Sequence, residues 1–319
     1  MASKETFIPP NPPIGIIESL SSGFEVVASH LPLVILPIAV DTCLWLGPRL
    51  LIREMNFGAL AQLFKAFQQL PDLYLPVFFL PSLIGLREAK PLPFNYTPEV
   101  YEILRPEEYY GAFGIAILLG YVVWMIYAGM IGQLVADGLV RPVEMGRQVF
   151  AVSLQIAIVF ALAILLISVA LLPIQIILST SMLEAGNYLM LIVVLLVSGI
   201  LGAFVVFFVF TPHSMFMNRR NLIAAMFDSM QVVQWNLAPT LGLLALIGLI
   251  GMAMHQVWMY ADPGSWVIMI AICGNAFINT GLVAATFVYF KDRHRYWREL
   301  RDALIAEFER RRARQQQES

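Results

Sequence analysis

The sequence predicts an all-α fold: a polytopic transmembrane bundle of six spans in three units, each an interfacial amphipathic helix followed by a transmembrane hairpin. Two observations support this fold class. First, 59% of the 319 residues are hydrophobic and only 13% are charged, which is about half the charged share of soluble domains. Second, an amphipathic stretch, a long apolar run, a break and another apolar run occur together three times, beginning near Gly15, Gly138 and Asn221.

Six apolar runs are long enough to cross a bilayer, which takes about 20 residues as a helix. The third run is long enough to tilt or to kink at Pro173. A further run, 73–86, is short and contains Pro76 and Pro81, which favours a re-entrant or interfacial element over a span. The six predicted spans are residues 27–47, 111–134, 149–178, 187–212, 237–260 and 265–290.

These spans divide the chain into three units and a tail. The first unit, 1–134, contains an outer segment at 48–110 that the other two units lack, and the remaining parts are compact. The second unit is 135–212, the third is 213–290, and the tail is 291–319.

Basic residues orient the chain, because cytoplasmic loops of membrane proteins are enriched in Lys and Arg. Nine of the 20 Lys and Arg residues lie in the tail 291–319, which should therefore be cytoplasmic. The loops that contain Arg141 and Arg147, and Arg219 and Arg220, fall on the same side. We expect a multi-pass protein of the cell membrane (plasma or bacterial inner membrane) with both termini in the cytoplasm.

The first unit does not follow this charge rule. In the six-span topology, the segment 49–110 lies outside although it carries six basic residues. A seven-span alternative, in which 73–86 also crosses, brings Arg49, Arg53 and Lys65 inside. We favour six spans because all three amphipathic stretches then lie on the cytoplasmic face.

Four polar residues in the predicted spans form a candidate intramembrane site. A polar or ionisable group at membrane depth suggests function, because its desolvation is costly. Asp41 lies near the outer end of the first span, and Gln155 lies on the third. Asn275 and Asn279 are four residues apart and share one helix face. Bonding between helices is the competing interpretation of Gln155, Asn275 and Asn279, since amides link transmembrane helices. For Asp41 the competing interpretation is a structural carboxylate that Arg49 or water neutralises.

Motifs for catalysis, metal binding and cofactor binding are absent from the sequence. It contains no HExxH, GxSxG, P-loop or GxGxxG pattern. Cys43 and Cys273 both lie in apolar runs, which argues against a disulfide framework or a cysteine metal site. We therefore expect no catalytic residues, no metal and no cofactor, and the sequence does not favour an enzyme.

The tail is predicted to be an amphipathic helix with a basic end. Trp297, Leu300, Leu304 and Phe308 form an apolar stripe at helical spacing. We expect the bilayer, and anionic headgroups at the tail, to be partners, together with a membrane protein or a second copy. Acidic residues within the tail argue against nucleic acid. The residues expected to contact lipid headgroups are Arg219, Arg220, Arg310, Arg311, Arg312 and Arg314.

Two stretches carry a resemblance to a group of membrane proteins: SLSSGFEVVASHLPLVILPI, and FTPHSMFMNRRNLIAAMFDSMQVVQWNLAPTLGLL. In the second, Pro212, residues 224–229 and Asn236 match a pattern of proline, amphipathic helix with a serine, and polar residue at membrane entry. This pattern resembles the uncharacterised YciC-like bacterial inner-membrane proteins and the membrane domain of some glycerophosphodiester phosphodiesterases. The resemblance covers about 14–290, departs at 48–110, and implies fold and topology.

The sequence supports three functional hypotheses. The first is a membrane scaffold, a lipid-organising protein or an accessory subunit of a complex, suggested by interfacial helices and a basic tail on one face. The second is a small-molecule or ion transporter that uses the intramembrane polar residues. The third, an intramembrane enzyme, has the least support, because a cluster of ionisable groups is missing from the spans.

Overall fold

The computed structural model describes residues 10–47, 49–52, 99–103, 105–159, 161, 196, 199–200, 202–262 and 264–318. Within these ranges the chain is helical apart from one short pair of strands, so the predicted helical fold class is confirmed. The elements are α1 (Ile16–Ser29), α2 (Pro32–Leu46), β1 (Arg49–Ile52), β2 (Val100–Ile103), α4 (Pro106–Asp137), α7 (Thr211–Asn218), α8 (Leu222–Trp235), α9 (Leu237–Met259) and α10 (Val267–Glu318). Residues 142–159 are also helical.

Within the part of the chain that the structure describes, three helices are long and apolar enough to cross a membrane. They are Leu118–Asp137 in α4, Leu237–Trp258 in α9, and the apolar part of Val267–Ala313 in α10. These three helices coincide with the predicted spans 111–134, 237–260 and 265–290. The predicted span 149–178 lies largely outside the described residues, and 73–86 lies wholly outside them. Of the predicted span 187–212, the second half is described and belongs to the shorter apolar helix Gly202–Asn218.

The predicted first span, 27–47, is divided between two helices. α1 ends at Ser29, α2 begins at Pro32, and the two helices are bent by 83°. Pro32 explains the break, because proline lacks the amide hydrogen that would continue the α1 ladder. α2 has 15 residues, a length of about 22 Å, whereas the hydrocarbon core is about 30 Å thick. α2 alone is therefore shorter than the hydrocarbon core, and the bend turns α1 away from its direction.

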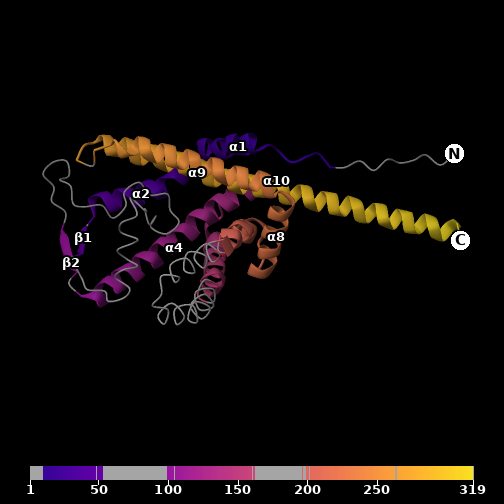
Figure 1. The fold of residues 1–319 in the computed structure, drawn as a ribbon, viewed down its shortest axis with the longest axis horizontal. Coiled ribbons are helices and arrows are strands. Elements are labelled where there is room, and N and C mark those ends of the chain that lie inside the picture. Colours follow the sequence, from indigo (N-terminus) through magenta and orange to yellow (C-terminus); the bar gives the residue numbers. More distant parts are fainter. Residues whose placement is uncertain are drawn as a thin grey trace, which may run out of the picture.

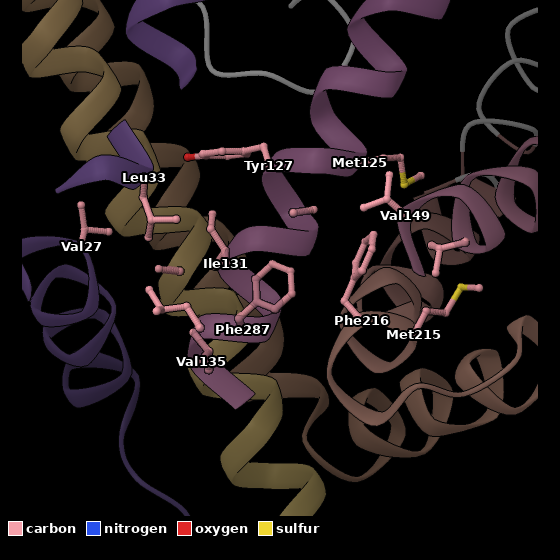
Figure 2. Packing of buried hydrophobic residues seen from close by; sticks show 14 of the residues in the cluster. Val27, Leu33, Met125, Tyr127, Ile131, Val135, Val149, Met215, Phe216 and Phe287 are labelled. Carbon is pink, nitrogen blue, oxygen red and sulfur yellow. The ribbon is translucent and has the colours of Figure 1, made fainter. Parts of the chain in front are cut away.

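The long helix α10 is the axis around which the other helices pack (Figure 1). α1 lies along it, and small residues allow a close approach: Gly23 of α1 faces the backbone of Ala285. The main apolar core lies between α10, α4 and α7, where Ile131, Phe216 and Phe287 are buried (Figure 2). This core fixes the ends of α4 and α7 against the middle of α10.

The bundle has two chemically different ends. At one end the Lys291 ammonium donates to the Val135 carbonyl at 2.6 Å, and the Arg293 guanidinium donates to the Ile14 carbonyl at 3.2 Å. At the other end the rings of Trp45 and Trp266 meet at 6.2 Å. The first end, which holds Ile14, the end of α4, α7 and the polar half of α10, is called the basic end below.

The strands β1 and β2 lie at the opposite end, after α2 and before α4. They pair in parallel, with Arg49 opposite Val100 and Ile52 opposite Ile103. Parallel strands require the intervening chain to return to the side where it began. The intervening residues 53–98 lie outside the described part of the chain.

Candidate functional site at the basic end

A buried carboxylate, Asp228 of α8, joins three helices at the basic end. Its Oδ2 accepts a hydrogen bond from the Ser214 hydroxyl of α7 at 2.6 Å. The Arg220 Nε lies 3.4 Å from the same oxygen, and the His294 Nε2 of α10 lies 3.6 Å from Oδ1. The Asn218 amide donates to the Ser214 hydroxyl at 3.4 Å. These five residues are called the Asp228 cluster below.

Opposing effects act on the Asp228 carboxyl. Burial penalises its charged form and raises its pKa, but hydrogen bonds from His294 and Ser214, together with the charges of His294 and Arg220, outweigh burial. The net result is a pKa below the ordinary value. Asp228 is therefore an anion at neutral pH, held by donors from three elements.

The arrangement of the Asp228 cluster suits a structural link better than nucleophilic catalysis. A catalytic serine needs a base at its own hydroxyl, with the carboxylate behind that base. Here the Ser214 hydroxyl is bonded directly to Asp228, while His294 approaches the other carboxylate oxygen. The polar groups of the Asp228 cluster are therefore occupied by bonds that join α7, α8 and α10.

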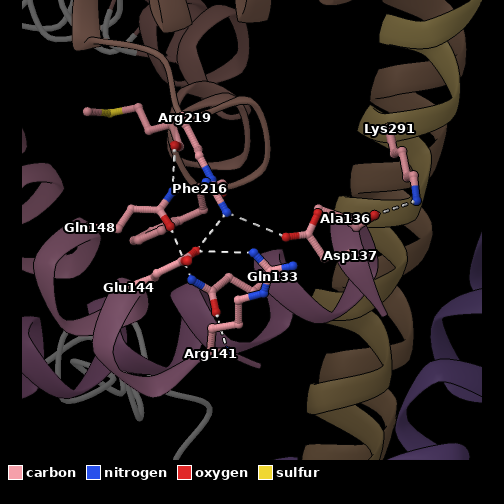
Figure 3. Close-up of polar contacts among 10 residues, drawn as sticks. Gln133, Ala136, Asp137, Arg141, Glu144, Gln148, Phe216, Arg219 and Lys291 are labelled. Carbon is pink, nitrogen blue, oxygen red and sulfur yellow. Dashed lines mark hydrogen bonds and ion pairs between the residues drawn. The ribbon is translucent and has the colours of Figure 1, made fainter. Parts of the chain in front are cut away.

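A second polar network ties the end of α4 to the helix at 142–159 and to α7 (Figure 3). The Gln133 carbonyl oxygen accepts from the Arg141 amide at 3.0 Å, and its amide nitrogen donates to Gln148 at 3.3 Å. Gln148 in turn donates to the carbonyl oxygens of Phe216 at 2.7 Å and Met215 at 3.0 Å. Gln148 therefore satisfies carbonyl groups left unpaired at the end of α7, and Gln133 connects it to the end of α4.

Arg219 closes this network on its exposed side. It follows α7 with a left-handed φ of 53°, a conformation that turns the chain toward α8. Its guanidinium lies 3.0 Å from Glu144 and 3.6 Å from Asp137. Arg219 and Arg220, both predicted to contact headgroups, thus each form ion pairs within the protein.

The segment before α1 is held by the polar half of α10. The Ile14 amide donates to the Asp292 carboxylate at 2.7 Å, which also accepts from Arg295 at 2.7 Å. The Arg293 guanidinium lies 3.7 Å from the centre of the Tyr289 ring, a cation–π contact. Asp292 and Arg293, just after the apolar run of α10, therefore hold the segment before α1 at Ile14.

Of the predicted intramembrane residues, Asn275 and Asn279 lie one turn apart on α10, and Asp41 lies on α2. The Asn279 amide donates to the Asn275 side-chain oxygen at 2.7 Å and to its backbone carbonyl at 3.0 Å. Trp45 of α2 packs in a cluster with Ala271 and Ile272 of α10. Asp41 precedes Trp45 by one helical turn and is buried.

Gln155 lies apart from the other three. Its side-chain oxygen accepts from the Leu222 amide at 2.9 Å, and its nitrogen donates to the Ala151 carbonyl at 3.2 Å. Gln155 therefore supplies a hydrogen bond to the first turn of α8, where amide groups lack helical partners. It contributes to the basic end rather than to an intramembrane group.

Sequence reasoning missed the Asp228 cluster. One signal was available: Asp228 lies on the same helical stripe as Ala225 and Val232, both of which are buried. A carboxylate on the apolar side of an amphipathic helix implies a buried partner. Asp292 and His294 gave no such signal, because they stand among charged residues of the tail.

An apolar pocket of about 550 Å³ lies between α9 and α10, far from the Asp228 cluster. It is lined by Trp258, Met269, Ile270, Cys273, Gly274 and Phe277. None of these side chains is an acid or base suited to proton transfer at neutral pH. Among the described residues, His, Cys, Asp and Glu do not gather in groups of three that would hold a metal ion.

Comparison with known proteins yields no match to a family, a curated protein or a solved structure.

Proposed function

We propose that this chain is a non-enzymatic multi-pass membrane protein that acts as a scaffold or accessory subunit of a membrane complex. This proposal rests on how the polar side chains at the basic end are bonded. Those of the Asp228 cluster and of the glutamine network are bonded between helices, which makes the basic end a rigid platform. From this platform α10 extends outward by several turns (Figure 1).

A transport path is less well supported. Such a path needs polar side chains that line a hydrated cavity, whereas Asp41 is 0% exposed and Asn275 is 4% exposed. The Asn279 amide is bonded to Asn275 on its own helix. Burial of Asp41 and Asn275 within the bundle favours packing between helices over passage of a solute.

The proposal includes six spans, with the basic end in the cytoplasm. Ile14, the end of α4, α7 and Lys291 lie together, as expected if an even number of crossings separates each from the next. The pairing of β1 with β2 also supports this topology. In the six-span topology β1 and β2 flank one outer segment and are expected side by side, whereas the seven-span topology places a crossing at 73–86 between them.

A reporter inserted after Lys65 tests the topology. We expect an alkaline phosphatase fusion to be active and a fluorescent-protein fusion to be dark at this site, because phosphatase folds outside the cytoplasm. A fusion after Ser319 is the control and should give the opposite pair of signals. Cytoplasmic signal after Lys65 would contradict the six-span proposal.

The scaffold function is tested by the mass of the protein extracted from native membranes. Extraction in polymer nanodiscs followed by single-particle mass measurement should give particles heavier than one 35.7 kDa chain with its lipid belt. Purified chain reconstituted in the same nanodiscs provides the monomer reference. Native particles with the same mass as this monomer reference would contradict the scaffold proposal.

A further inference from the structure

The apolar pocket between α9 and α10 is open at the surface of the bundle. Ile270, one of its lining residues, is 68% exposed, and Cys273 is exposed as well. Both helices are apolar enough to cross a membrane where they line the pocket, so the opening faces hydrocarbon rather than water. The hollow formed by Trp258 of α9 and by Met269, Ile270, Cys273, Gly274 and Phe277 of α10 is called the Trp258 pocket below.

The length of the Trp258 pocket matches one leaflet of a bilayer. From Met269 to Phe277 it follows α10 for about 12 Å, which is close to half of the hydrocarbon core of about 30 Å. It begins two residues after the start of α10 at Val267, in the leaflet opposite to the basic end. The pocket therefore extends from the membrane boundary toward the middle of the bilayer.

Gly274 gives the pocket its shape. A methyl group at this position would lie 2.7 Å from both Cη2 and Cζ2 of the Trp258 ring. The indole therefore occupies space that any other side chain would fill. At the deep end, the Phe277 ring lies 6.0 Å from the ring of Phe24 in α1, so α1 supports that wall of the pocket.

The Trp258 indole provides a polar group that lacks a partner. Among the described residues, no atom accepts a hydrogen bond from its Nε1, although this nitrogen is buried. A buried donor without an acceptor is costly, and the hydrocarbon region contains no water to replace the missing partner. Trp258 is the penultimate residue of α9, so its indole lies at the membrane boundary, the level where tryptophan is enriched.

We propose that the Trp258 pocket binds one acyl chain of an ester-linked glycerophospholipid. The chain lies along α10 from Met269 to Phe277, and its ester carbonyl accepts a hydrogen bond from the Trp258 indole. Any lipid tail is as apolar as the pocket, so apolar area alone gives no preference. The fit beside Gly274 and the hydrogen bond supply it. Binding here requires that α9 and α10 cross the membrane and does not depend on the scaffold function.

A helix from a partner or from a second copy is too large for the Trp258 pocket. An α-helix is about 10 Å across, so about 12 Å of its length occupies roughly 900 Å³. The pocket has a volume of about 550 Å³. A hydrocarbon chain is narrower than a helix and rotates about each of its single bonds, so it follows the pocket from Trp258 to Phe277.

Retention of one phospholipid tests the occupant. The full chain is purified in detergent, depleted of lipid and titrated with dioleoyl phosphatidylcholine, and native mass spectrometry counts the bound molecules. We expect one retained lipid, bound about tenfold more weakly by Ile270→Trp, because the larger side chain fills the pocket. Leu249→Trp in α9 is the matched control: Leu249 is 61% exposed and lies outside the pocket, so affinity should change less than about twofold. Both positions are exposed, so both variants should fold.

The hydrogen bond is tested with the diether analogue of the same lipid, which has no carbonyl oxygen. The wild type should bind the ester about fivefold more tightly than the ether, a factor typical of one neutral hydrogen bond. Trp258→Phe keeps an aromatic ring in the pocket but removes the N–H group. This variant should therefore bind the ester and the ether equally.

Three outcomes would overturn this assignment: no lipid retained by the wild type, equal weakening by Ile270→Trp and Leu249→Trp, or the same preference for ester over ether in the wild type and Trp258→Phe. A loss of mass from native particles in Ile270→Trp alone would assign the pocket to a partner helix and overturn lipid binding. Monomeric native particles that retain one lipid would remove the scaffold proposal and support the lipid site.

Discussion

Gly23→Ala is expected to destabilise the bundle by about 1–3 kcal/mol, the usual cost of overpacking. The added methyl group would lie 2.6 Å from the Ala285 Cα and still closer to its amide nitrogen. Both are backbone atoms, so a change of rotamer cannot relieve the clash. Relief requires α1 to move away from α10, the contact on which the position of α1 depends.

The sign of this effect is its most informative feature. Glycine-to-alanine changes inside helices usually stabilise by up to about 1 kcal/mol. Gly248→Ala, in α9, is the control, because its new methyl group meets nothing within 4 Å. In thermal unfolding in detergent, we expect Gly23→Ala to lower Tm and Gly248→Ala to leave it unchanged or raise it.

The destabilisation caused by Gly23→Ala should extend to the segment just before α1. Ile14 is bonded to Asp292 and Arg293 of α10, and displacement of α1 pulls Ile14 away from both. Proteolysis at the segment before α1 should therefore accelerate in Gly23→Ala and not in Gly248→Ala. Equal Tm values and equal cleavage for the two variants would show that α1 does not rest on α10.

Sequence patterns located the helices that are continuous and apolar, and they failed at breaks and joins. Spans at 111–134, 237–260 and 265–290 follow from hydropathy alone, since a long apolar run has few other solutions. The break before Pro32 was not located, because average hydropathy does not register a missing amide hydrogen. Nor was the continuity of α10 across Lys291, because a change in polarity looks like a boundary even when the helix persists.

The sequence also did not identify what contacts the apolar face of each amphipathic helix. The sequence shows that α1 has an apolar side but cannot show whether that side meets lipid or protein. Gly23 settles it only when Ala285 is seen opposite. Gln155 poses the same difficulty: at sequence level it lies in a predicted span, and only the fold shows that it bonds to the start of α8. In both cases the deciding partner is distant along the chain.

Removing the Asp228 carboxylate should produce the largest loss at the basic end. Asp228→Ala leaves the Ser214 hydroxyl and His294 without their acceptor, and breaking a buried ionic group costs about 3–5 kcal/mol. Asp302→Ala is the control, because Asp302 is exposed and pairs only with its neighbour Arg301. Surface pairs of this kind contribute about 0–1 kcal/mol, so its Tm should stay near that of the wild type.

The pH dependence distinguishes lost charge from lost packing. The pKa of Asp228 is lowered from 3.8, so its carboxylate stabilises the folded state above that pH, and the contribution disappears as pH falls through the folded-state pKa. Asp228→Asn has no such charge. The Tm difference between wild type and Asp228→Asn should therefore shrink as the pH is lowered below 3.8. A difference that stays constant across this range would mean that Asp228 acts through its shape, and that α7, α8 and α10 are joined without its charge.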